Sequence, residues 1–216
     1  MTTNKTHTLF LLWVLLISLT GFGLYMTWHK GFFQWIILTD NTRICVVIVL
    51  AFVVGSALAG WRSIYLSRQT QYFEQIRGGF SDFKLGQSIC HDYLTHPLAH
   101  PSEGQLMAEV MAERARGTHQ VGWFITGLMI KLGLLGTVVG FIMMLSSLEG
   151  LEQLDISDIK TLMQQMTQGM GVAMNTTLVG LIGSILLGVQ FLMLDRHADK
   201  LIAATVDYAH RNVKAS

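Results

Sequence analysis

Four long apolar blocks constrain this chain more than any other feature of its sequence. They lie at about 8–28, 44–61, 127–148 and 169–194. Each block reaches the ~17–25 residues that a helix needs to cross the hydrocarbon of a bilayer. Only 13% of the 216 residues are charged, whereas soluble domains carry about 25%. The sequence therefore predicts an all-α membrane protein with four transmembrane helices.

The first block has the basic residue and the apolar run of a signal peptide, because Lys5 precedes it. However, no small-x-small cleavage site follows, and the sequence continues as TGFGLYM from Thr20. We expect this block to be retained as a membrane anchor.

The distribution of basic residues predicts the orientation. Lysine and arginine are frequent in 62–119 and 195–216, whereas the short segments 29–43 and 149–168 contain few of them. The positive-inside rule then places both termini and the 62–119 segment in the cytoplasm. We expect a multi-pass protein of a bacterial inner membrane whose two short loops face outward.

This topology divides the chain into a pair of helices, a cytoplasmic helical segment, a second pair of helices and a cytoplasmic tail. The parts are 1–61, 62–119, 120–194 and 195–216. Within the cytoplasmic segment, 104–120 has a helix-compatible composition, so we expect the third helix to begin well before the membrane. Lys131 would then lie near the cytoplasmic interface.

Small residues and hydroxyl groups recur at helical spacing in the last two blocks. One stripe is Thr126, Ile130, Gly133, Thr137 and Gly140, and the other is Ala173, Thr177, Gly180, Ser184 and Gly188. Membrane helices commonly pack through such stripes, so packing is one explanation of them. The consecutive Asn175, Thr176 and Thr177 are harder to explain, because they cannot all face one helix and polar groups at membrane depth are costly. Packing and an ion pathway both remain open at this point.

Two stretches of these blocks carry a resemblance to a known family. The sequence GLLGTVVGF at 133–141 is followed about 30 residues later by GMGVAMNTTLVGLIGS at 169–184. This pair resembles the two pore helices of the MotA/TolQ/ExbB proton-channel family, and especially its ExbB and TolQ branch. The resemblance covers roughly 120–195, and the first 119 residues share only the topology.

The resemblance implies roles for individual residues. Thr137 and Thr177 match the pore-lining threonines of the family, and we add Thr176, Asn175 and Ser184 as candidates for the ion pathway. The small packing positions of the pore helices are matched by Gly133, Gly136, Gly140, Ala173 and Gly180.

The resemblance also implies an assembly and a function. Family members form a homo-oligomeric ring, a pentamer, in which the third and fourth helices line a pore around a dimer of a single-span partner of the MotB/TolR/ExbD type. An aspartate of that partner carries the ion, and ion flow drives mechanical work in the envelope. The apolar blocks of this chain contain no Asp or Glu, so an ion-carrying carboxylate has to come from another chain.

The sequence departs from the family pattern at one informative position. ExbB and TolQ often carry a glutamate three residues after the first glycine of the fourth-span motif, where this chain has Val172. The cytoplasmic segment is also short for a flagellar torque generator, so we do not expect a flagellar role. We expect the translocated ion to be a proton, with sodium as the alternative because Asn175 and Thr176 add polarity.

Metal binding, nucleic-acid binding and catalysis have little support in the sequence. Cys90, His91, His96 and His100 cluster in the cytoplasmic segment, but their spacing matches no standard zinc pattern, so we predict neither a metal site nor a cofactor. The near-zero net charge gives no electrostatic support to nucleic-acid binding. The sequence also shows no catalytic constellation or phosphate-binding glycine loop, so we do not expect an enzyme.

The competing hypothesis to an ion channel is a non-conducting tetraspan scaffold or transporter accessory protein.

Overall fold

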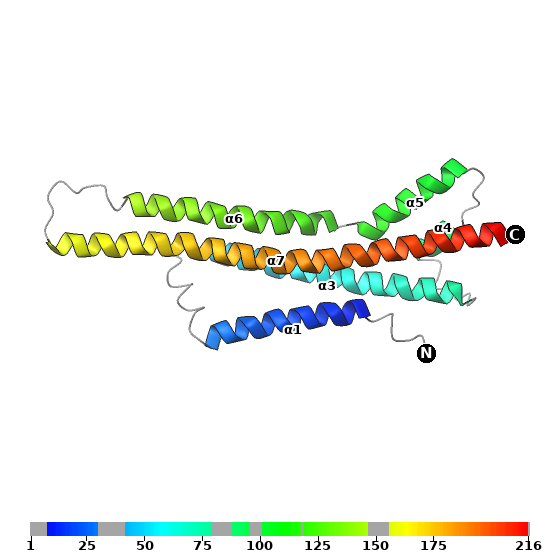
Figure 1. Ribbon diagram of the computed structural model, residues 1–216, viewed down its shortest axis with the longest axis horizontal. Helices are drawn as coiled ribbons and strands as arrows, with labels where there is room; N and C mark the ends of the chain where they lie inside the picture. The colour runs from blue at the N-terminus through cyan, green and yellow to red at the C-terminus, as the bar shows by residue number, and fades with distance from the viewer. Residues whose placement is uncertain are drawn as a thin grey trace. The chain divides into compact units, whose positions relative to one another are not determined.

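The computed structural model describes residues 8–29, 42–78, 88–95, 101–117, 119–146 and 156–215, and every regular element among them is an α-helix. The helices are α1 (Thr8–His29), α3 (Ile44–Arg77), α4 (Ile89–Thr95), α5 (Pro101–Arg116), α6 (His119–Ser146) and α7 (Ile156–Ala215), as Figure 1 labels them.

Three of these helices are long and apolar enough to cross a membrane. They are α3, α6 and the Ile159–Arg211 part of α7. The first predicted block forms α1, within which Leu11–Gly23 is a shorter apolar segment. The described residues thus have the composition and secondary structure of an all-helical membrane protein, while the fourth span stays a prediction.

The last helix extends far beyond the predicted span at 169–194. Helix α7 includes most of the predicted outer loop, 149–168, and nearly all of the predicted tail, 195–216 (Figure 1). An ideal helix of its 60 residues is roughly 90 Å long. Beyond the apolar block, buried residues recur three or four positions apart, which keeps this part helical by packing one face. They are Ala198, Leu201, Thr205 and Ala209.

The expectation of one continuous helix through 104–120 was wrong, because a turn at Gly117 separates α5 from α6. Gly117 has φ of +43°, a left-handed conformation that ends helices and that glycine adopts at little cost. Its amide N–H donates to the Glu113 carbonyl at 2.7 Å, and the Arg62 guanidinium donates to the Arg114 and Ala115 carbonyls at 2.9 and 2.8 Å. These donors satisfy carbonyl groups that the helix end leaves free.

The second predicted block likewise continues past its expected end at 61. Helix α3 runs on to Arg77 and stops immediately before Gly78, the first glycine of a pair that interrupts the helical pattern. The predicted cytoplasmic segment therefore begins as a continuation of a membrane helix. Its short helix α4 and its longer helix α5, which starts at Pro101, follow as separate pieces.

The chain divides into two compact units, and each long helix contributes to both. One unit contains the described residues of 1–16, 57–122 and 189–216, and its core is formed by two small apolar clusters. These are Phe73, Cys90 and Leu201, and Tyr93, Met111 and Ala209. The other unit contains 17–56 and 123–188, and its closest packing is between α6 and α7.

Candidate functional site

The closest helix contact in the second unit is made by the glycine face of α6. Gly133, Gly136 and Gly140 are all buried. A Cβ atom at Gly140 would lie 2.6 Å from the Gly169 carbonyl oxygen, and one at Gly133 would lie 3.2 Å from the Thr176 carbonyl oxygen. Because the neighbouring atoms belong to the backbone, Gly140 has no room for a side chain, and Gly133 accepts one only if the backbone of α7 shifts by a few tenths of an ångström. Close backbone approach of this kind is typical of packed membrane helices.

The facing surface of α7 is complementary. A Cβ atom at Gly169 would lie 2.7 Å from the Gly140 carbonyl oxygen, and one at Gly180 would lie 2.8 Å from the Met129 carbonyl oxygen. Ala173 also meets Gly140, at its backbone nitrogen and its methyl group. The structure therefore brings the five predicted packing positions together in one contact between α6 and α7.

Two threonines of α7, Thr176 and Thr177, lie at this contact and form different interactions. The Thr177 hydroxyl donates across the helices to the Gly133 carbonyl and along its own helix to the Ala173 carbonyl, both at 3.1 Å. Thr176 is 0% exposed and packs against Gly136, while its hydroxyl donates to the Val172 carbonyl at 2.9 Å. Thr177 thus links the two helices by a polar contact, whereas Thr176 fills the space that a glycine leaves.

The predicted ion-pathway residues fall into two groups by exposure. Thr137 and Thr177 are half-buried, and the Thr137 hydroxyl donates to the Leu134 carbonyl at 2.6 Å. Thr176, Asn175 and Ser184 are buried. The Asn175 side chain is only 6% exposed, and its Nδ2 has no hydrogen-bond partner among the described residues. The burial of the second group favours packing roles and leaves the two half-buried threonines as the better candidates for a pore wall.

An open apolar groove of about 450 Å³ runs beside Thr137. Val138, Phe141 and Met170 line it, and each of these side chains is more than half exposed. Large apolar side chains with this exposure are stable against lipid or against another apolar helix. Thr137 therefore lies at the edge of a surface on which a further helix can pack.

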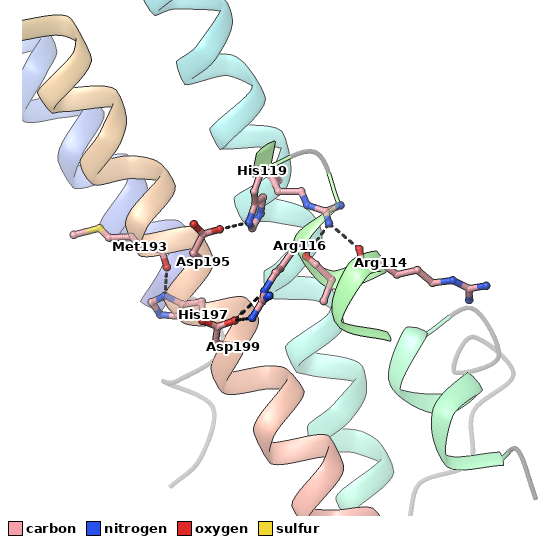
Figure 2. A network of polar contacts seen from close by, with 9 residues as sticks. Arg114, Arg116, His119, Met193, Asp195, His197 and Asp199 are labelled. Carbon is pink, nitrogen blue, oxygen red and sulfur yellow. Dashed lines mark hydrogen bonds and ion pairs between the residues drawn. The ribbon is translucent and has the colours of Figure 1, made fainter. Parts of the chain in front are cut away.

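The first unit contains a polar network that sequence reasoning missed (Figure 2). His119 at the start of α6 contacts Asp195 of α7 at 2.5 Å, and Arg116 of α5 is paired with Asp199 of α7 at 2.8 Å. The partners are 76 and 83 positions apart in the sequence. No spacing rule pairs residues at that separation, so only the packing of the helices identifies them.

The cysteine and histidine cluster forms no metal site in the part of the chain that the structure describes. His96 and His100 lie outside the described residues. Cys90 is buried and accepts a hydrogen bond from Thr205 at 3.4 Å. Burial raises the pKa of its thiol, which keeps the sulfur protonated and unreactive.

Three long apolar helices and a glycine-lined helix pair with a bridging threonine define the protein as a helical membrane protein. Residues 100–206, about half of the chain, match the family model described as the MotA/TolQ/ExbB proton channel family. The chain belongs to this family, and the matched segment includes α5, α6 and most of α7. Searches of curated proteins and of solved structures returned no match.

Proposed function

We propose that this protein is the proton-conducting channel and stator subunit of an inner-membrane motor that converts ion-motive force into mechanical work. The observation that carries the proposal is the α6–α7 contact, where the Thr177 hydroxyl lies within a tight glycine interface. A hydroxyl both donates and accepts hydrogen bonds, so it can hold a water molecule beside a carboxylate. Membership of a proton-channel family supports the same role.

The carboxylate that carries the proton has to come from a partner chain. Residues 161–194 of α7 contain no ionisable side chain, and α6 contains no Asp or Glu. Proton pathways through membranes normally use ionisable groups at depth. We therefore propose a single-span partner of the MotB/TolR/ExbD type that supplies an aspartate next to Thr137 and Thr177.

The proposed assembly is a ring, with five copies as the family resemblance implies. In each copy α1 acts as the fourth span, and both termini face the cytoplasm in accordance with the positive-inside rule. The exposed apolar surface of α6, which includes Leu134, Val138 and Phe141, supports contact with further helices. We take the ion to be a proton rather than sodium, because Thr176 and Asn175 are buried within one copy and the Thr176 hydroxyl is already bonded to its own helix.

The assembly has a direct test. Purified in mild detergent, the protein is expected to give a native mass of about 120 kDa, five times its 24.1 kDa chain mass. Co-expression with a single-span protein that has an aspartate near the start of its span is expected to add two partner chains. A protein that stays monomeric in several mild detergents and retains no such partner contradicts the proposal. That outcome favours the tetraspan scaffold.

A further inference from the structure

His119, the first residue of α6, faces Asp195 of α7 with its imidazole ring (Figure 2). The His119 Nδ1 atom lies 2.5 Å from the Asp195 Oδ1 atom. The histidine side chain is 3% exposed, whereas the aspartate side chain is 30% exposed. The pair therefore has a buried end and a partly exposed end.

The other nitrogen of the ring is also informative. His119 Nε2 is buried without a hydrogen-bond partner among the described residues, and the Phe191 ring lies edge-on with its centroid 6.4 Å from that of the imidazole. An ionised carboxylate only accepts hydrogen bonds, so Nδ1 carries the proton that faces charged Asp195. A lone pair then remains on Nε2, and this nitrogen is where the ring can take a further proton. In this state the pair has net charge −1 and can take one more proton.

Fixed positive charges border the pair. Besides Asp195, the charged groups that interact with His119 are Arg62 of α3 and Arg116 of α5. Arg116 is held by Asp199 at 2.8 Å, and Arg62 is held by the carbonyl groups at the end of α5. The burial of the ring lowers the pKa of the His119 imidazole, Asp195 opposes this effect, and the two arginines add to it, so that the pKa lies below its ordinary value. Opposing effects of this kind suit a group that both binds and releases a proton.

The pair lies just past the end of the uncharged stretch of α7. Asp195 is the first ionisable residue of α7 after the uncharged stretch 161–194. Thr177 precedes Asp195 by 18 residues in α7, and Thr137 follows His119 by 18 residues in α6. The same number of residues therefore separates the pair from each threonine along the two helices.

We propose that the His119–Asp195 pair is a proton-binding site that receives the translocated proton and passes it to cytoplasmic water. The inference rests on the proposed function. On binding, Nε2 takes one proton from water and the ring becomes an imidazolium beside Asp195, so the pair is neutral overall, and on release Nε2 returns that proton to water. No other bond forms or breaks.

Proton flux into vesicles that hold this protein together with its co-purifying single-span partner tests the inference. His119→Gln and Asp195→Asn each remove one titratable group while keeping a polar side chain. We expect each to lower the flux at pH 7 at least tenfold. His197→Gln is a matched control from the same stretch of α7, and it is expected to conduct within twofold of the unsubstituted protein.

The pH profile separates proton binding from a structural role. Flux of the unsubstituted complex is expected to change as the cytoplasmic-side pH falls below the ordinary histidine pKa, because the pKa of His119 is lowered, and the residual flux of His119→Gln is expected to be flat. If the flux of both variants falls in proportion to the amount of assembled complex and the pH profile is unchanged, the pair is only a structural link. That result overturns the inference. An unsubstituted complex that conducts no protons refutes the proposed function itself. A conducting complex in which His119→Gln conducts normally refutes only this inference.

A measurement without substitutions covers the case in which His119→Gln fails to assemble. Nitrogen NMR of the histidine-labelled, unsubstituted complex reports the protonation state of each imidazole. We expect one ring that does not respond to water-soluble quenchers to take up a proton in an acid titration, at a pH below the ordinary histidine pKa. If the buried ring keeps one protonation state throughout this titration, the pair does not exchange protons and the inference is wrong.

Discussion

Replacing Thr177 with valine is expected to lower proton flux through the assembled complex roughly ten- to a hundredfold. The substitution keeps the side-chain shape but removes the hydroxyl that donates to the Gly133 carbonyl at 3.1 Å. Without it, water and the partner carboxylate lose a hydrogen-bonding group, and a lost bond at a buried site costs ~1–3 kcal/mol. Added to the activation barrier for proton transfer, that cost corresponds to the ten- to hundredfold loss of rate. Thr137→Val is expected to act in the same direction, and the double variant to be lowest.

Two further variants make this experiment specific. Thr177→Ser keeps the hydroxyl and is expected to retain most of the flux. Thr176→Val changes a fully buried neighbour whose hydroxyl bonds only to its own helix, so its flux is expected to match that of the unsubstituted protein. If Thr137→Val, Thr177→Val and the double variant all conduct normally, the threonines are packing residues. If Thr176→Val alone abolishes flux, the lumen side of α7 is rotated by about 100°, one residue of the helix.

Gly140→Ala is expected to destabilise the folded protein by about 1–3 kcal/mol, the usual cost of overpacking a close contact. The added methyl group would lie 2.6 Å from the Gly169 carbonyl oxygen and 2.7 Å from the Ala173 backbone nitrogen. Both neighbours are backbone atoms, so the strain is relieved only if α6 and α7 move apart. Unfolding of the purified protein in detergent, followed by circular dichroism, measures the loss.

Gly127→Ala is the matched control, because it makes the same change in the same helix. A Cβ atom at Gly127 meets no described atom within 4 Å. We expect this variant to be as stable as the unsubstituted protein or slightly more so, because alanine favours helix more than glycine does. Equal stability of Gly140→Ala and Gly127→Ala would show that α6 and α7 do not approach as closely as the structure indicates.

The sequence predicted the helical architecture and the family well, because both depend on local patterns. Runs of apolar residues identify membrane helices, and small residues at helical spacing identify the faces that pack. The contact of Gly133, Gly140 and Gly180 follows from that spacing. Exposure within the contact could not be predicted, since Thr176 and Thr177 are neighbours in the sequence and only the packing of α6 distinguishes them.

The parts outside the apolar blocks were less predictable. The apolar block of α7 ends at Leu194, but the helix continues because Ala198, Leu201 and Thr205 bury one face of an otherwise polar stretch. That amphipathic pattern was present in the sequence and is weaker than the apolar signal beside it. The turn at Gly117 follows from its left-handed backbone, and one glycine in a helix-compatible stretch does not predict it. The His119–Asp195 contact needed the folded helices.

Proton flux driven by a membrane potential tests the central claim most directly. The comparison is between vesicles that contain this protein alone, this protein with its single-span partner, and the same complex with the partner's intramembrane aspartate changed to asparagine. We expect rapid flux only in the complex with the intact partner, because residues 161–194 supply hydroxyls but no carboxylate. Equal flux in all three preparations would contradict the need for a partner carboxylate, and the absence of flux in all three would contradict a channel.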